Sequence, residues 1–313
     1  MTVHFVGSGP GAADLLTVRA TRMLAAADVV LYPGTYLDPE VLDHCAPGAE
    51  LVDTQGLDLD RITERLVTAH GDGAEMVRLT SGDPSVYSAL AEQTRRLDAH
   101  GVPWDVTPGV PAYAAASALV GRELTVPLVS QSVVLTRTQA RSTVMPETES
   151  LEAFAATRAT LVLHLAIRRV RGLMERIEPE YGADCPVVVA HRVGGPEEAV
   201  LHGTVGDIAD AVEEAGFRQA AVILVGRALA PLRFGGIGMD EQWPDVYTIN
   251  FRDMAAVVSD VPIAQLDPIP ENVLAHERVN ETVMRDHTVI PMSFGTIFKT
   301  REDILELLRS AYD

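Results

Sequence analysis

Cysteine is scarce in this chain of 313 residues, which contains only Cys45 and Cys185. The two lie far apart, and neither belongs to a Cys-x-x-Cys motif or a Cys/His pair at metal-ligand spacing. This argues against a disulfide framework and a structural zinc, so we expect no metal and a cytoplasmic location. Lysine is rarer still, because Lys299 is the only lysine among 25 Lys and Arg residues, a bias that GC-rich genomes produce.

Long apolar runs and excess positive charge are missing too. No stretch of about 18 uncharged apolar residues occurs, so we expect no membrane span. No basic segment precedes the first apolar run, which argues against a signal peptide. The net charge of −19 argues against nucleic-acid binding, because a nucleic-acid binder needs a basic face.

The first 112 residues alternate short apolar runs with amphipathic stretches, a pattern typical of a parallel sheet covered by helices. The expected strands are residues 3–6, 28–32, 75–79 and 104–106, and the expected helices are residues 14–27, 59–69 and 86–100. We treat residues 1–112 as one α/β domain.

A second α/β domain is expected over residues 113–231. Its expected strands are residues 132–136, 160–164, 186–190 and 221–225, and its expected helices are residues 151–156, 168–177 and 205–215. The polar stretch 137–150 is long for a loop in a compact domain, which suggests a functional or mobile segment.

The first glycine-rich loop reads VGSGPGAADLLT over residues 6–17 and lies between an expected strand and an expected helix. Glycines there let the backbone approach a ligand closely. The spacing also fits a relaxed dinucleotide-binding fingerprint. Pro10 weakens that alternative, since it removes an N–H from the loop that would hold the pyrophosphate. The loop alone leaves both ligands open, beside a plain tight turn.

Two further loops lie at comparable junctions. Residues 79–87 read LTSGDPSVY, and residues 106–116 read VTPGVPAYAAA. The first also fits a helix N-terminus, with Ser81 or Asp83 as N-cap and Pro84 at the first helical position.

Taken in order, the three loops resemble those of the tetrapyrrole methyltransferase family. The resemblance implies two αβα domains with S-adenosyl-L-methionine in the cleft between them, usually in a homodimer. It also implies cofactor contacts made largely by backbone amides and apolar surface. These contacts are Pro10, Ser81, Gly82, Asp83, Val86, Pro111, Ala112 and Leu165.

Within this family, residues 131–167, 44–54 and 181–192 closely resemble the enzymes that methylate precorrin-4 at C-11. The resemblance spans about residues 1–230 and implies C-methylation of precorrin-4 or cobalt-precorrin-4 in cobalamin biosynthesis. The chain departs from the family pattern at two places, with Ala12-Ala13 where many members have Asp-Pro and with a proline at position 84. Neither departure changes the expectation of methyl transfer.

A corrin precursor carries many carboxylates, so its cleft should be locally basic on this acidic chain. We expect Arg137 and Arg141 to hold the substrate, because Arg pairs carboxylates bidentately. Arg168, Arg169 and Arg171 fit a solvated helix face better. His44, His164 and His191 are expected to be structural, and Tyr32, Tyr36 and Tyr113 are cleft candidates. The sequence identifies no catalytic residue.

Residues 232–313 depart from this pattern after a Gly/Pro-containing stretch. Strands are expected at 246–251 and 254–258, and helices at 271–285 and 301–312. The motifs VYTINFRDMAAVVSDVP, ENVLAHERVNETVM and TVIPMSFGTIFKTREDILELL resemble the gas vesicle GvpL/GvpF family.

This resemblance implies an incomplete α+β fragment of an assembly protein, with gas vesicle proteins as partners. An alternative function is therefore gas vesicle assembly, with the methyltransferase as a fused passenger.

Overall fold

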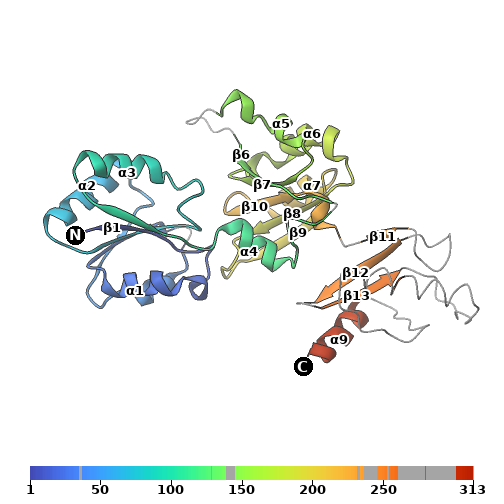
Figure 1. Ribbon diagram of the computed structural model, residues 1–313, viewed down its shortest axis with the longest axis horizontal. Coiled ribbons are helices and arrows are strands. Elements are labelled where there is room, and N and C mark those ends of the chain that lie inside the picture. Colours follow the sequence, from blue (N-terminus) through green and yellow to red (C-terminus); the bar gives the residue numbers. More distant parts are fainter. Residues whose placement is uncertain are drawn as a thin grey trace, which may run out of the picture. The chain divides into compact units, whose positions relative to one another are not determined.

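The computed structural model describes residues 1–34, 37–127, 129–138, 145–230, 233–235, 245–251, 254–259, 279 and 301–312. The chain divides into two compact units, Met1–Leu229 and Ala230–Asp313. The first unit holds two α/β halves, each built on its own five-stranded sheet (Figure 1).

The sheet of the first half is entirely parallel, in the order β3-β2-β4-β1-β5. Its strands are β1 (Val3–Gly7), β2 (Val29–Tyr32), β3 (Glu50–Asp53), β4 (Met76–Thr80) and β5 (Trp104–Thr107). Its helices are α1 (Val18–Ala26), α2 (Leu59–Gly71) and α3 (Leu90–Ala99). The predicted parallel sheet with helices is confirmed.

Alternation along β1 places its side chains in two separate cores. Phe5 packs with Leu66 of α2 and Leu97 of α3, whereas Val6 packs with Ala20 and Leu24 of α1. Helices therefore cover both faces of the sheet, with α1 on one side and α2 and α3 on the other (Figure 1).

Helix α3 begins at Leu90, later than predicted. The segment before it is a loop in which Tyr87 and Ala89 have positive φ angles of 55° and 57°. The interpretation of Ser81 or Asp83 as helix N-cap, with Pro84 at the first helical position, is therefore wrong.

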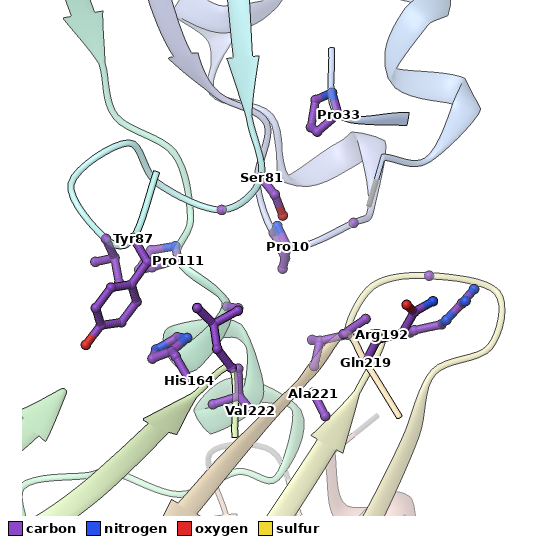
Figure 2. A pocket seen from close by; sticks show the side chains of 18 of the residues that line it. Pro10, Pro33, Ser81, Tyr87, Pro111, His164, Arg192, Gln219, Ala221 and Val222 are labelled. Atoms are coloured by element: carbon purple, nitrogen blue, oxygen red, sulfur yellow. The ribbon is translucent and has the colours of Figure 1, made fainter. Parts of the chain in front are cut away.

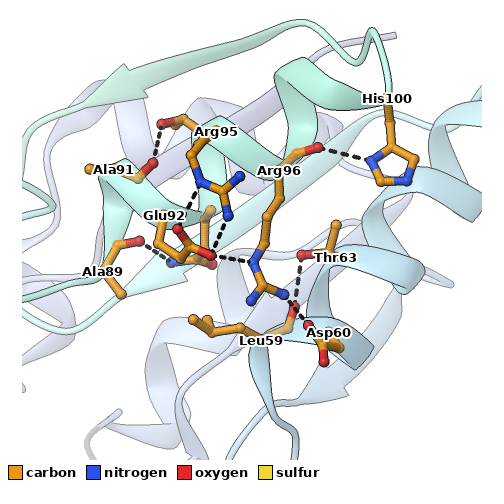
Figure 3. Close-up of polar contacts among 11 residues, drawn as sticks. Leu59, Asp60, Thr63, Ala89, Ala91, Glu92, Arg95, Arg96 and His100 are labelled. Atoms are coloured by element: carbon orange, nitrogen blue, oxygen red, sulfur yellow. Dashed lines mark hydrogen bonds and ion pairs between the residues drawn. The ribbon is translucent and has the colours of Figure 1, made fainter. Parts of the chain in front are cut away.

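An ion-pair network joins α3 to α2 on the surface (Figure 3). Glu92 accepts hydrogen bonds from Arg95 and Arg96, and Arg96 also pairs with Asp60 of α2. These hydrogen bonds, that of Arg95 first, lower the pKa of Glu92 to about 2. The network is exposed and lies outside the site described below.

The second half has a mixed sheet in the order β6-β7-β10-β8-β9. Its strands are β6 (Val133–Arg137), β7 (Thr160–His164), β8 (Pro186–His191), β9 (Ala199–Thr204) and β10 (Ala221–Val225). Its helices are α4 (Ala112–Leu119), α5 (Leu151–Ala155), α6 (Val170–Tyr181) and α7 (Ile208–Ala215).

Strand β10 lies between β7 and β8 and runs antiparallel to both. The carboxyl ends of β7 and β8 therefore lie beside the amino end of β10, on the same side of the sheet as seen along its strands. Only β6 and β7 pair in parallel among the described strands of this sheet.

Short 3-10 helices complete the first unit, at Ala13–Leu15, Pro39–His44, Glu147–Glu149, Ile167–Arg169 and Arg227–Leu229.

The second unit contains an antiparallel sheet, β11-β12-β13, and the helix α9. The strands are β11 (Arg233–Gly235), β12 (Asp245–Phe251) and β13 (Met254–Ser259), and the helix is α9 (Arg301–Tyr312). Ala256 of β13 packs with Ile304 and Leu308 of α9. The helix predicted at 271–285 lies outside the described residues except for Val279. Among the helices that the structure describes, none has the length and apolar character needed to cross a membrane.

Candidate functional site

The three glycine loops of the sequence meet where β1, β4 and β5 end. Gly9 and Gly82 exchange backbone hydrogen bonds of 3.1 and 2.7 Å. A Cβ atom on Gly7 would lie 2.5 Å from the backbone nitrogen of Gly109, and one on Gly109 would lie 2.3 Å from the carbonyl oxygen of Gly82. Glycine is thus required at positions 7 and 109 because the loops touch through their backbones.

Asp83 ties the second loop to the third. Its carboxylate accepts hydrogen bonds from the backbone N–H groups of Ser85 and Gly109, both at 2.8 Å. Burial alone would raise its pKa, but the hydrogen bonds from the Ser85 side chain and from the backbones of Gly109 and Ser85 lower it below its ordinary value. Asp83 is therefore an anion beside the site.

A cavity of about 820 Å³ lies between the two halves of the first unit, with Pro10 and Ser81 on one side and His164 and Arg192 on the other (Figure 2). Its volume is typical of small-molecule sites. All eight residues predicted to contact the cofactor line it, namely Pro10, Ser81, Gly82, Asp83, Val86, Pro111, Ala112 and Leu165.

Residues with strained backbone conformations cluster around this cavity. Six non-glycine residues among those described have positive φ angles, and four of the six line the cavity. These four are Tyr87, Leu165, Arg192 and Ala220. Such strain persists where the surrounding structure enforces it, which is common at ligand sites.

Part of the lining suits the apolar surface of a ligand that is held by backbone groups. Leu165 is 73% exposed, an apolar surface that a ligand would cover. A Cβ atom built on Gly82 would face Pro111 and Ala112 at ordinary contact distance, which marks the space between these loops as narrow. The residues therefore fit the methionine and adenosine parts of S-adenosyl-L-methionine, which they would hold through backbone groups and apolar surface.

Four arginines among the described residues of the second half line the cavity, namely Arg168, Arg169, Arg192 and Arg218. Both Arg168 and Arg169 are exposed, as predicted for a solvated face, but they also line the cavity, which the sequence did not indicate. They lie in the 3-10 turn just after β7, before α6 begins. Arg171, the third member of that predicted group, is not among the cavity-lining residues and pairs with Asp210 at 2.6 Å and Glu213 at 2.7 Å.

Of the predicted substrate residues, Arg137 ends β6 and is not among the cavity-lining residues. Its Nη1 donates to the carbonyl oxygen of Thr138, which does line the cavity, at 3.3 Å. Arg141 lies outside the described residues.

His164 lines the cavity rather than only supporting the core. Its ring lies 5.4 Å from that of Tyr87 and 6.5 Å from that of Tyr113. Its buried Nε2 has no hydrogen-bond partner among the described residues, and burial lowers its pKa. The terminal position of His164 on β7 could have indicated this placement.

The other His and Tyr candidates lie elsewhere. His191 stacks on Phe217 at 4.1 Å, and His44 ends a 3-10 helix. Tyr32 ends β2 and is not among the lining residues, and Tyr36 lies outside the described residues. Within the described part of the chain, no group of three or more His, Cys, Asp or Glu side chains could hold a metal ion.

Two α/β halves around a cavity of glycine loops define an enzyme of the two-domain methyltransferase class. The family model of the tetrapyrrole (corrin/porphyrin) methylases matches residues 2–209, and the chain belongs to this family. This membership removes the ground for the dinucleotide alternative at the first loop.

Curated relatives support the assignment. A precorrin-4 C(11)-methyltransferase from a Sinorhizobium species is 50% identical over 229 residues, covering 73% of this chain and 90% of the relative. The enzyme of the same name from Rhodococcus erythropolis is 49% identical over 79% of this chain and 96% of its own. A cobalt-precorrin-4 C(11)-methyltransferase from Methanocaldococcus jannaschii is 35% identical, covering 73% of this chain and 88% of the relative.

Solved structures agree. The cobalamin biosynthetic enzyme cobalt-precorrin-4 methyltransferase superposes with a TM-score of 0.71 at 35% identity, covering 74% of this chain and 96% of that one. A uroporphyrin-III C-methyltransferase from Thermus thermophilus, complexed with S-adenosylhomocysteine, gives a TM-score of 0.61 at 30% identity over 73% and 93% of the chains. The predicted two-domain fold is confirmed.

A second family model, that of the gas vesicle synthesis protein GvpL/GvpF, matches residues 218–313. The match begins ahead of β10, a central strand of the second sheet, so it overlaps the methylase unit.

Proposed function

We propose that this chain transfers the methyl group of S-adenosyl-L-methionine to C-11 of precorrin-4. The observation that carries the proposal is the cavity in which all eight predicted cofactor residues meet. Relatives named for this reaction cover most of the methylase unit at close to half identity. The relatives named for the cobalt substrate are 35% and 37% identical, which favours the metal-free ring.

S-adenosyl-L-methionine would supply a methyl group already activated by a positive sulfur. The chain's own contribution is then binding, orientation and exclusion of water. The loops at Pro10, Ser81–Asp83 and Pro111-Ala112, together with Leu165, would hold one reactant, and the remaining residues of the facing wall would hold the other. Such alignment can lower a barrier by about 7–11 kcal/mol.

The test is incubation of the full chain with precorrin-4 and S-adenosyl-L-methionine carrying a ¹³C methyl group. We expect a product that has gained one labelled methyl group, placed at C-11 by NMR. No transfer, or transfer to another carbon, would overturn the proposal. Cobalt-precorrin-4 in a parallel reaction tests the preference for the metal-free ring.

The domain boundaries at 112 and 231, the homodimer and the cytoplasmic location are part of the same proposal. The family resemblance supports the dimer, and light scattering of the purified chain tests it. For the second unit we propose a role separate from methyl transfer, because the cavity lies in the first unit, where every described residue that lines it falls between Pro10 and Val222. Gas vesicle proteins are the partners that the family match supports.

A further inference from the structure

The two sides of the cavity differ in the charge of the side chains that line them. Among the described residues that line it, both carboxylates, Asp38 and Asp83, belong to the first half. The described residues of the second half contribute four arginines and no carboxylate to the lining. Arg78 of the first half also reaches the cavity, but its Nη1 donates to the Leu79 carbonyl oxygen at 2.8 Å and its Nε to Gln93 at 3.3 Å.

The topology of the second sheet gathers these cations. Arg168 lies in the turn after β7, Arg192 directly follows β8, and Arg218 shortly precedes β10. Because β10 runs antiparallel between the other two strands, all three positions fall at one edge of the sheet. We call Arg168, Arg192 and Arg218 the arginine rim.

Backbone contacts fix the rim in place. The Nε of Arg168 donates to the carbonyl oxygen of Arg218 at 2.9 Å. The backbone N–H of Arg192 donates to the carbonyl oxygen of Ala220 at 2.8 Å, and both residues have positive φ angles, of 47° and 52°. The rim is therefore part of the folded edge rather than a set of independent surface side chains.

The Arg192 side chain pairs with Glu197 at 2.7 Å, and the Glu197 side chain is 66% exposed. An exposed ion pair of this kind is weak, so a ligand carboxylate can replace Glu197 at small cost. A guanidinium offers a planar pair of donors that matches a carboxylate.

We propose that the arginine rim binds peripheral carboxylates of the tetrapyrrole, so that one carboxylate-bearing edge of the ring faces the second sheet and the cationic cofactor lies toward Asp83. The inference rests on the proposed function and assigns carboxylate recognition to residues other than Arg137 and Arg141. It also accounts for anion binding by a chain whose net charge is −19, since the cations are concentrated on one cavity wall.

The experiment is a fluorescence titration of the full chain with uroporphyrin III, a tetrapyrrole with eight carboxylates, and with its octamethyl ester. We expect Arg192→Gln and Arg168→Gln each to weaken uroporphyrin binding about tenfold, the effect of losing one charge-assisted hydrogen bond. Binding of the acid should weaken as salt rises, because its attraction to the rim is electrostatic.

Arg171→Gln is the matched control, since Arg171 lies close to Arg168 in sequence but pairs with Asp210 and Glu213 on the surface. It should bind like the parent, and all variants should keep their affinity for S-adenosylhomocysteine in calorimetry. Arg137→Ala in the same titration separates the rim from the residue predicted from sequence.

Parental binding by the Arg168 and Arg192 variants, equal binding of the ester, or a loss confined to Arg137→Ala would each overturn the inference. Porphyrin binding requires no methyl transfer, so this result is independent of whether the product is methylated at C-11.

Discussion

His164 lines the cavity, and burial lowers the pKa of its ring. Below about pH 6.5, the ordinary pKa of histidine, the unfolded chain therefore binds more protons at this residue than the folded chain does. Its contribution to stability is present above that pH and is lost as the pH falls toward the native pKa. The groups facing the ring are Tyr87, Tyr113 and, in register on β6, Arg137.

We therefore expect His164→Gln to lose less stability than the parent between about pH 7 and pH 5.5. The measurement is the midpoint of thermal unfolding across this range. His100→Gln is the control, because His100 is exposed and its ring bonds the Arg96 carbonyl oxygen in the last turn of α3. Parallel curves for the His164 variant and the parent would show that the buried ring does not control acid stability.

A substitution at Gly82 should have two effects that can be measured separately, one on stability through backbone strain and one on ligand binding through lost space. It has a φ angle of 70°, and a Cβ atom there would lie 3.7 Å from the Ala112 nitrogen and 3.8 Å from the Pro111 Cα. Gly82→Ala should thus lower stability by about 1 kcal/mol through strain. It should also weaken S-adenosylhomocysteine binding about tenfold, because the added methyl group narrows the cofactor space.

Gly73→Ala is its matched control. Gly73 has a φ angle of 74°, and nothing lies within 4 Å of the position of its Cβ atom. It should show a similar loss in the thermal midpoint with unchanged affinity in calorimetry. Equal affinities in the two variants would show that Gly82 does not border the cofactor.

At the scale of elements, the sequence predicted what local patterns determine. Apolar runs buried on both faces, such as β1 and β4, read as strands of a parallel sheet, and the sheet has that form. The start of α3 was wrong because Tyr87 and Ala89 adopt left-handed conformations that no residue preference indicates. Such conformations depend on the surrounding loops rather than on nearby sequence.

The arginine rim escaped prediction for a related reason. Arg168 and Arg169 have the spacing of an exposed helical face, and only the insertion of β10 between β7 and β8 brings the ends of these strands together. Strand order is a property of the whole sheet. The cofactor loops could be predicted from the sequence, because three motifs in a fixed order along the chain are typical of the family. The cavity's arginines could not, because they follow or precede separate strands that only the folded sheet brings together.

The position of β10 yields a prediction about the overlap of the two family matches. Val222 and Leu224 lie in one core and Ile223 and Val225 in another, and all are at most 5% exposed. A chain ended after Phe217, just before the GvpL/GvpF match begins, loses this central strand. We expect it to be insoluble or to lack a cooperative thermal transition, because the sheet would have unpaired edges at β7 and β8. A soluble, cooperative product would show that β10 belongs to the second unit.

At the scale of the whole molecule, the two compact units divide at Leu229, and the cavity lies in the first of them. The second unit has its own sheet and its own core at Ala256, Ile304 and Leu308. Methyl transfer should therefore depend on the first unit alone.

Ending the chain after Leu229 should leave kcat within about twofold of the full chain and the main thermal transition nearly unchanged, because it removes no core residue of the methylase unit. The truncation keeps β10 and the 3-10 turn Arg227–Leu229, whose Ala228 and Leu229 are buried. Turnover of precorrin-4, the thermal midpoint and the oligomeric state are measured beside the full chain. The truncation after Phe217 serves as the negative control, since it differs by only the segment that completes the second sheet. A large fall in kcat for a soluble truncated protein with the parental oligomeric state would show that the second unit acts on the catalytic cavity.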